Sequence, residues 1–183
     1  CLLSRGLGDV YKRQLRYQIF RSQARTLTHE LLCRQPELLS GDVELDQVRI
    51  EPITHEAVSA SLEWLTSGCL FPWEDIVDWK DSDPKGFDLA IWFGSELCGL
   101  CYASPRKSRL CIKVILLQGN PSRSHPLRGE IAGLALTSID FYARMLGCQE
   151  IEIQDPVEGA KSVYEALGFT WTAKGRLVIQ VDP

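Results

Sequence analysis

The stretch DPVEGAKSVYEALGF, residues 155–169, predicts a short helix whose two ends are both marked in the sequence. Asp155 can cap the first turn with its side chain, Pro156 suits the first helical position, and Glu158 lies where a capping box places its acid. Gly168 can adopt the left-handed conformation that ends a helix. We therefore expect the helix to begin beside Asp155 and to stop at Gly168.

Four residues of this helix recur at spacings of three and four and so share one face: Ala160, Val163, Tyr164 and Leu167. The ring of Tyr164 therefore points toward whatever this face packs against. A tyrosine on an apolar helical face is usually a core residue whose hydroxyl reaches the rim. The pattern Ala-x-x-x-Tyr-x-x-x-Gly-Phe at 160–169, however, resembles the closing motif of the GNAT acyltransferase superfamily. This resemblance implies a catalytic tyrosine at position 164.

Three strands are predicted in the middle of the chain. Phe87–Phe93 and Leu97–Ser104 are separated by Gly94-Ser95, a pair of residues suited to a tight hairpin turn. Arg109–Leu117 follows as a strand rich in Leu, Ile and Val, which is typical of a strand buried on both faces. The order predicts an antiparallel meander.

A long helix and a parallel strand pair are predicted after this meander. Apolar residues recur with helical period up to Gly147, which can end the helix: Ile131, Leu134, Ala135, Ile139, Tyr142, Met145 and Leu146. A strand at Glu150–Gln154, the Tyr164 helix and a final hairpin at 169–171 and 177–181 complete the order. A strand, helix and strand in succession favour a crossover, so we expect one parallel pair in an otherwise antiparallel sheet.

The first part of the chain predicts helices and one strand. A helix is expected at Gln18–Arg34, a strand at Val43–Ile53, a helix capped by Thr54, and a short helical segment at Pro72–Trp79. The order of elements over residues 43–181 is similar to the GNAT fold. The resemblance implies an α+β (mixed α/β) class with three layers: a mostly antiparallel central sheet with one splayed parallel pair, and helices on both faces.

Three regions are expected along the chain. Residues 4–14, SRGLGDVYKRQ, have no apolar period and are similar to a translated sequencing-library adapter, so residues 1–14 are interpreted as a non-native segment. Residues 15–42 would form the N-terminal helix and a linker, and residues 43–183 the GNAT-like domain. The native amino terminus is expected to be missing.

The composition is that of a soluble globular domain. The net charge is −4, and setting aside residues 1–14 removes three basic residues and one acid, which leaves −6. An acidic chain argues against nucleic acid as the main partner and is compatible with a cationic substrate. No apolar run reaches the roughly 20 residues of a membrane helix, and no secretory signal is recognisable, so a cytoplasmic location is expected.

The seven cysteines are interpreted as reduced thiols that fill the core. Cys98 and Cys101 have a metal-like spacing, but the sequence offers no second pair or nearby histidine to complete four ligands. Three residues along a regular strand would also place their sulfurs on opposite faces. No metal site is therefore expected.

The resemblance implies acetyl-CoA as co-substrate and a phosphate-binding loop before the long helix. GNAT proteins usually carry Gln/Arg-x-x-Gly-x-Gly/Ala there, and Arg128-Gly-Glu-Ile-Ala-Gly133 matches its first and sixth positions. Unpaired amides at a helix start attract phosphate. The residues expected to bind the pyrophosphate are Arg128, Gly129, Ile131, Ala132 and Gly133.

Two features leave the register of this loop open. Ile131 replaces the middle glycine, and a β-carbon there could obstruct the phosphates. The connection is also long, so the loop could instead begin near residues 122–124, with Pro126 opening the helix.

The resemblance also places the reacting arm of acetyl-CoA. Leu116, Leu117 and Gln118 are expected to line it, with a main-chain amide near Leu116 or Leu117 holding the oxyanion. Val157 stands where GNAT proteins have an asparagine, which removes a polar contact. Tyr164 would act as general acid on the departing thiolate.

The base and the acceptor are less defined by the sequence. GNAT proteins often use a glutamate or an ordered water chain as base, and no residue here clearly matches. Glu152, which shares a strand face with Glu150, is the candidate base for an incoming ammonium; His125 in the loop and Glu74, Asp75 and Asp78 in the early helical segment are the other groups considered. The reaction implied is transfer of an acetyl group to a small-molecule amine or a protein amino group, and a homodimer is compatible with the exposed sheet edges. The alternative is a catalytically weak or inactive GNAT-like module that binds CoA or a protein partner, and Ile131 and Val157 favour it.

Overall fold

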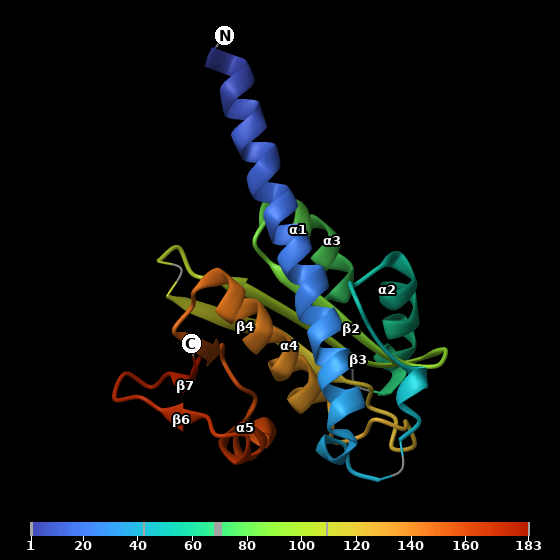
Figure 1. Cartoon of the computed structure of the whole chain (residues 1–183). Helices are drawn as coiled ribbons and strands as arrows, with labels where there is room; N and C mark the ends of the chain where they lie inside the picture. Colours follow the sequence, from blue (N-terminus) through green and yellow to red (C-terminus); the bar gives the residue numbers. More distant parts are fainter. Residues whose placement is uncertain (1, 42, 68–70, 109, 183) are drawn as a thin grey trace.

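The computed structural model describes residues 2–41, 43–67, 71–108 and 110–182. Its centre is a seven-stranded sheet of order β1-β2-β3-β4-β5-β7-β6 (Figure 1). Every neighbouring pair is antiparallel except β4 and β5, which are parallel, as the sequence predicted. The strands are β1 Val48–Glu51, β2 Phe87–Phe93, β3 Glu96–Pro105, β4 Cys111–Gly119, β5 Glu150–Ile153, β6 Thr170–Trp171 and β7 Leu177–Gln180.

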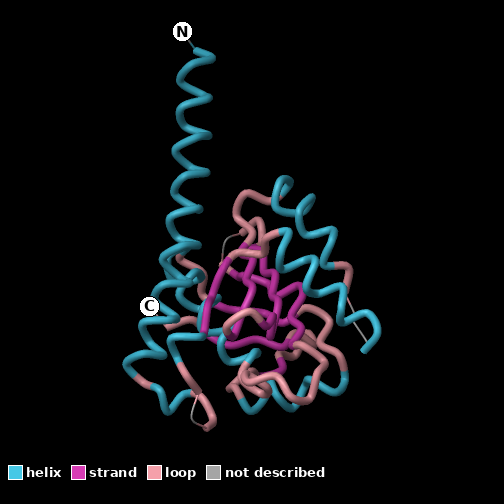
Figure 2. Tube along the Cα trace, turned by 90° about the vertical axis from the view of Figure 1, so that its right-hand side faces the viewer, coloured by secondary structure: helices cyan, strands magenta, loops and turns pink. Residues whose placement is uncertain are grey.

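Helices cover both faces of the sheet, so the molecule has three layers (Figure 2). On one face lie α1 (Leu2–Arg34) and α4 (Ile131–Leu146), and the other carries α2 (His55–Ser61) and α3 (Ile76–Ser82). Each face has its own apolar cluster, because alternate strand residues point to opposite sides. This is the α+β arrangement that the sequence predicted. The short helix α5 (Lys161–Ala166) lies in the connection between β5 and β6.

Short 3₁₀ helices join these elements. They are η1 Pro36–Leu38, η2 Leu45–Gln47, η3 Leu62–Ser67, η4 Trp73–Asp75 and η5 Glu158–Ala160. The strand expected at Val43–Ile53 is therefore shorter than predicted, because η2 occupies its beginning. The segment expected at Pro72–Trp79 becomes η4 followed by α3. Of the described helices, none combines the length and the apolar character needed to cross a bilayer.

Helix α1 begins at Leu2, whereas the sequence predicted a start at Gln18. Its first turns project beyond the sheet, and its later turns lie beside α4 (Figure 1). Ala24 is buried at this contact, and the buried hydroxyl of Thr28 donates to the hydroxyl of Ser138 on α4 over 2.9 Å. The side of α1 that carries Ala24 and Thr28 thus packs on α4.

The predicted helix ends are confirmed at two glycines and wrong at Asp155. Gly147 and Gly168 end their helices with φ of +76° and +93°, as the sequence predicted. The expected cap at Asp155 is wrong: Asp155 has φ of +44°, the chain remains extended at Val157, and η5 precedes α5. Asp155 therefore ends the connection from β5 and does not begin the helix.

The register of β3 also differs from the expectation. Ile91 pairs with Gly99 and Trp92 with Leu97, which leaves Cys98 as an extra residue. This bulge places Cys98 and Cys101 in the same apolar cluster, so the prediction of opposite faces is wrong. The strand expected at Arg109–Leu117 runs to Gly119, and Arg109 lies outside the described residues.

A buried carboxylate joins two helices and the segment after β1 to the sheet. Asp88 on β2 accepts from Arg25 of α1 at 3.1 Å, from Lys80 of α3 at 2.7 Å and from the main-chain N–H of Ile53 at 2.8 Å. Its side chain is only 4% exposed. A buried charge is tolerated only when it is paired and hydrogen-bonded, and this carboxylate meets both conditions.

We predict that Asp88→Ala lowers the free energy of unfolding by about 3 kcal/mol, because it leaves the nearly buried Arg25 without its counter-charge. Urea denaturation followed by circular dichroism measures this change. Glu30→Ala, which removes an exposed i,i+4 pair with Arg34, is the matched control and should change stability by less than about 0.5 kcal/mol. Equal losses in the two variants would contradict the role of Asp88.

Candidate active site

The parallel strands β4 and β5 separate after a short pairing. Their register ends at Val114 with Ile153, and the last bond runs from the N–H of Gln154 to the carbonyl of Val114 over 2.9 Å. On the other side of β4, Val114 and Leu116 pair with successive β3 residues, so Ile115 is an extra residue in the ladder. The remainder of β4 therefore faces a gap where β5 has turned away.

A hollow of about 250 Å³ lies in this gap, and we call it the strand-gap hollow. Its walls come from β4, the end of β5, the connection that follows β5, and α5. The lining residues are Phe71, Val114, Ile115, Leu116, Leu117, Ile153, Gln154, Asp155, Pro156, Val157 and Tyr164. Most of these are apolar, which suits an uncharged chain of carbon atoms.

Tyr164 reaches the strand-gap hollow from α5. It is 6% exposed, and its ring packs edge-on against Phe169 at 5.9 Å between ring centres. Its hydroxyl forms no hydrogen bond with any described residue. Burial, together with the Cys101 thiol, raises the pKa of this hydroxyl to about 12. The group is therefore a protonated donor at neutral pH.

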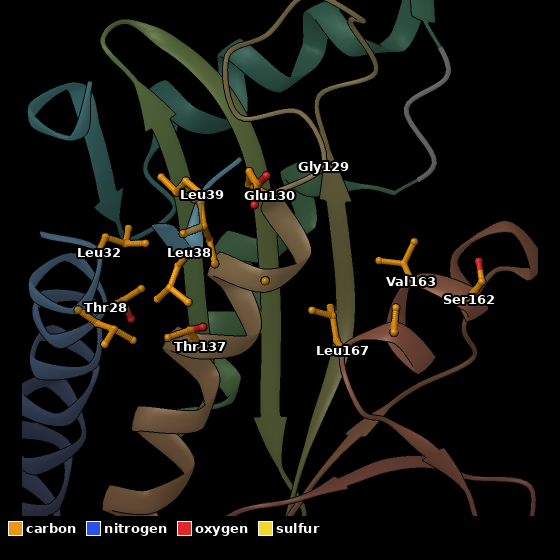
Figure 3. Close-up of a pocket in the computed structure, with 14 residues that line it drawn as sticks. Thr28, Leu32, Leu38, Leu39, Gly129, Glu130, Thr137, Ser162, Val163 and Leu167 are labelled. Carbon is orange, nitrogen blue, oxygen red and sulfur yellow. The ribbon is translucent and has the colours of Figure 1, made fainter. Parts of the chain in front are cut away.

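A second hollow, of about 520 Å³, lies at the start of α4, and we call it the helix-start hollow (Figure 3). One wall is formed by α1 and η1, another by the first turns of α4, and a third by α5. The lining residues are Thr28, Leu31, Leu32, Leu38, Leu39, Gly129, Glu130, Gly133, Leu134, Thr137, Ser162, Val163, Ala166 and Leu167. Because Val163 lines this hollow and Tyr164 the other, α5 separates the two.

The start of α4 lies beside the helix-start hollow. The first amides of a helix have no partner within it, and the helix dipole makes this end attractive to anions. Gly129 has φ of +89°, a conformation that glycine adopts without strain, and it lines the hollow. The carboxylate of Glu130 accepts from the N–H of Ser40 at 3.1 Å, which ties the linker after η1 to this end of α4.

Ile131 points toward the sheet. Its side chain is buried against Gly99 and Gly119, and a β-carbon on Gly99 would lie 2.4 Å from its Cγ2. The side chain of Ile131 therefore fills a space that two strand glycines leave open. The concern that it would obstruct an anion at the helix start is not supported by this orientation.

The structure brings together some of the residues predicted for the site and not others. Leu116, Leu117, Val157 and Tyr164 line the strand-gap hollow, and Gly129 and Gly133 line the helix-start hollow. Five of the predicted residues line neither hollow: Gln118, Arg128, Ile131, Ala132 and Glu152.

Gln118 and Arg128, which line neither hollow, make other contacts. Gln118 is buried and accepts from the indole N–H of Trp73 at 3.0 Å. Arg128 is exposed, and its guanidinium donates to the carbonyl of Arg123 at 3.3 Å. Sequence reasoning missed the wall from α1 and η1, because those residues precede the region that resembles GNAT proteins.

Glu152 lies in the paired part of β4 and β5, within a cluster of charged side chains. Its carboxylate accepts from Arg106 at 2.6 Å and from Arg176 at 2.9 Å, and it lies 3.3 Å from the ammonium of Lys113. Burial acts to raise the pKa of Glu152, but the bonds from Arg176 and Lys113 and the charges of Lys113 and Arg106 outweigh it and lower the pKa. These contacts make Glu152 a weak base.

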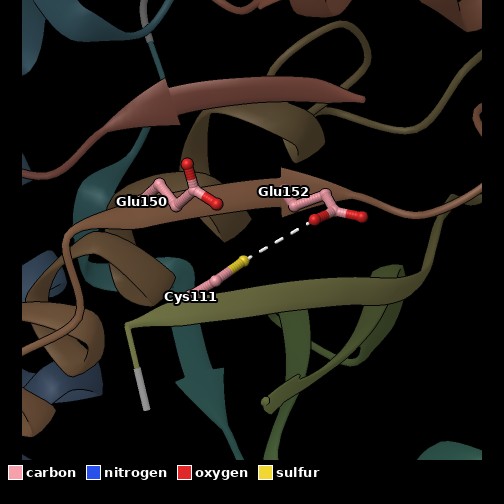
Figure 4. Close-up of side chains that lie close together, drawn as sticks. All are labelled: Cys111, Glu150 and Glu152. Carbon is pink, nitrogen blue, oxygen red and sulfur yellow. Dashed lines mark hydrogen bonds between the residues drawn. The ribbon is translucent and has the colours of Figure 1, made fainter. Parts of the chain in front are cut away.

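The same cluster contains three groups that could ligate a metal. The Sγ of Cys111 lies 3.7 Å from Glu152, and both residues lie close to Glu150 (Figure 4). Burial, together with the charges of Glu152 and Glu150, raises the pKa of Cys111 to about 12, so the thiol is protonated. Arginine and lysine side chains already neutralise the carboxylates, so the arrangement is that of an ion cluster.

We predict that the stabilisation by Glu152 depends on pH. Because its pKa is lower in the folded state than in the unfolded state, its contribution is complete above the unfolded pKa of about 4.3 and is lost as pH falls through the folded pKa. The loss of stability in Glu152→Gln should therefore be full at pH 7 and should shrink below pH of about 4. Urea denaturation across this range measures it, with exposed Glu37→Gln as control. A pH-independent difference would contradict the ion cluster.

Comparison with known proteins finds similarity in structure alone. No family model and no curated protein matches the sequence. Ard1 from Thermoplasma volcanium matches the structure with a TM-score of 0.58 at 14% identity, over 75% of this chain and 99% of its own. YncA from Salmonella typhimurium, solved with its cofactor acetyl-CoA, has a TM-score of 0.53 at 14% identity, over 74% and 95%.

A third similar structure is spermidine N-acetyltransferase from Vibrio cholerae, with a TM-score of 0.55 at 13% identity, over 74% of this chain and 94% of its own. At these identities the comparison establishes the fold and leaves the chemistry to the residues of this chain. The chain therefore has the fold of the GNAT acetyltransferases, as the order of elements in the sequence predicted.

Proposed function

We propose that this protein transfers an acetyl group from acetyl-CoA to an amine by direct attack. The observation that carries the proposal is the pair of hollows on either side of α5. One is an apolar gap that holds a protonated tyrosine, and the other lies against the start of a long helix. A thioester on a long uncharged arm, with a pyrophosphate at its far end, requires both environments.

The phosphate end would bind at the start of α4. Unpaired amides of the first helical turn, at Ile131 to Gly133, would donate to the pyrophosphate, with the dipole of a 16-residue helix behind them. Arg128 is exposed on the preceding loop and can approach the phosphates from solvent. The apolar arm would then lie along Leu116 and Leu117 in the strand-gap hollow.

The reacting carbonyl would lie beside the extra residue of β4. A bulge turns main-chain groups out of the regular ladder, so an N–H near Leu116 or Leu117 is the proposed donor to the oxyanion. The amine nitrogen attacks the carbonyl carbon and loses one proton to water as the amide forms, the carbon–sulfur bond breaks, and the departing sulfur takes the proton of the Tyr164 hydroxyl. The phenolate then regains a proton from solvent.

Water is the proposed acceptor of the proton that the incoming ammonium must lose. Three cations surround Glu152 and lower its pKa, so the proposal does not use it as the base. Asp155 lines the same hollow as Tyr164, and its carboxylate can attract a cationic acceptor. Spermidine is the acceptor in the name of one similar structure, and a small amine of this kind is compatible with the acidic hollow edge.

A second candidate is a module that binds CoA without turnover. Two observations favour it: Val157, which lines the strand-gap hollow with an apolar side chain, and the carboxylate of Glu130, which lies at the helix end where phosphates would bind. A carboxylate there repels an anionic ligand. Turnover distinguishes this candidate from the enzyme.

The first test is binding. A ligand that binds only the native state raises the melting temperature by mass action. We expect acetyl-CoA and CoA to raise it in a concentration-dependent way in a thermal-shift titration. The absence of a shift at millimolar cofactor would remove both candidates.

The second test is Tyr164→Phe, which removes the proton donor and keeps the ring that packs on Phe169. We expect thiol release with a panel of amines to slow at least tenfold, with CoA affinity changed less than about twofold, because the hydroxyl acts only on the departing sulfur. Phe169→Leu, which alters the same packing without removing the hydroxyl, is the control. An unchanged rate in Tyr164→Phe would assign the tyrosine to packing.

A further inference from the structure

Large apolar side chains are exposed on opposite walls of the helix-start hollow. Leu38 of η1 is 49% exposed, and on the α5 side Val163 and Leu167 are 44% and 40% exposed. These residues are more than 120 positions apart in the sequence, and the fold brings them to one hollow (Figure 3). Exposed apolar residues that gather around a concave site are typical of ligand binding.

The wall from the N-terminal segment is held firmly in place. The buried bond from Thr28 to Ser138 fixes α1 on α4, and the N–H of Ser40 binds the Glu130 carboxylate on the far side of η1. Leu32 and Leu39 are buried in the main apolar cluster. Leu38, between these anchors, is left facing the hollow. The position of this wall is therefore determined by the fold and does not depend on a ligand.

We propose that this N-terminal wall binds the adenosine end of CoA, so that α1 and η1 form part of the cofactor site. The proposal rests on the proposed function, which places the pyrophosphate at the start of α4. The pyrophosphate connects the nucleoside to the apolar arm, and the arm occupies the strand-gap hollow on one side of α5. The nucleoside must therefore extend from the start of α4 in another direction. The part of the helix-start hollow that is lined by α1, η1 and α5 is the space that remains.

The size and chemistry of this hollow suit a purine nucleoside. Its volume of about 520 Å³ is within the range of roughly 300–1,000 Å³ typical of small-molecule sites. A purine ring is flat and mainly apolar on its faces, so contact with Leu38 on one side and with Val163 and Leu167 on the other would bury all three side chains. Thr137 and Ser162 provide hydroxyls for its polar edges.

Leu38→Ser tests the proposal, because it shortens and polarises an exposed side chain of the wall and leaves the buried anchors intact. We measure binding by calorimetry for three probes: CoA, adenosine 3′,5′-bisphosphate and 4′-phosphopantetheine. We expect the first two to weaken about five- to tenfold and the third to change less than twofold. Leu62→Ser is the control, because Leu62 is 48% exposed on the opposite face of the sheet.

The outcomes separate this proposal from the proposed function. If the wild-type protein does not bind CoA, the proposed function fails and this inference fails with it. If CoA binds and Leu38→Ser leaves the affinities for CoA and the bisphosphate unchanged, or weakens 4′-phosphopantetheine equally, only this inference is overturned. Light scattering is run in parallel, since a dimer that dissociates in Leu38→Ser with unchanged CoA affinity would assign the wall to a second copy of the chain.

Discussion

The short parallel pairing of β4 with β5 is the constraint on which the candidate site depends. It ends at Val114 and Ile153, after which β4 continues to Gly119 while the chain leaves β5 at Asp155. A strand that loses its neighbour exposes main-chain groups and one row of side chains. Here the space is closed by α5, which brings Tyr164 into the gap. The bulge at Ile115 lies at the same level, so unusual main-chain geometry and the tyrosine meet in one hollow.

The position of the start of α4 depends on its packing against the sheet. Its start can lie against the sheet because Gly99 and Gly119 leave room for Ile131. This contact sets the direction in which the first turn points. The start of α4 then lies beside the helix-start hollow, whose other walls are α5 and the N-terminal segment. One packing contact inside the molecule therefore positions an anion-attracting helix end on its surface.

The acidic residues show why chemistry could not be assigned from residue type alone. Glu152 is on the strand and face where a base was expected, yet three cations contact it from β4, from the turn before β7 and from the loop after β3. These cations are 24 to 46 positions from Glu152 in the sequence, so no local pattern indicates the contacts. Asp88 shows the same point in the core, where its charge joins α1, α3 and the sheet.

The sequence by itself determined the order of elements, the parallel crossover, the ends of α4 and α5 at glycine, and the motif that singles out Tyr164. These follow from local rules: apolar period, left-handed glycines and the restricted handedness of crossovers. It misplaced the start of α5 and the faces of Cys98 and Cys101, because a left-handed Asp155 and a bulge in β3 depend on neighbouring strands. Only the tertiary structure decided that Glu152 is neutralised, that Ile131 turns inward, and that Leu38 lies across the helix-start hollow from α5. Each of these depends on residues that are far apart in the chain.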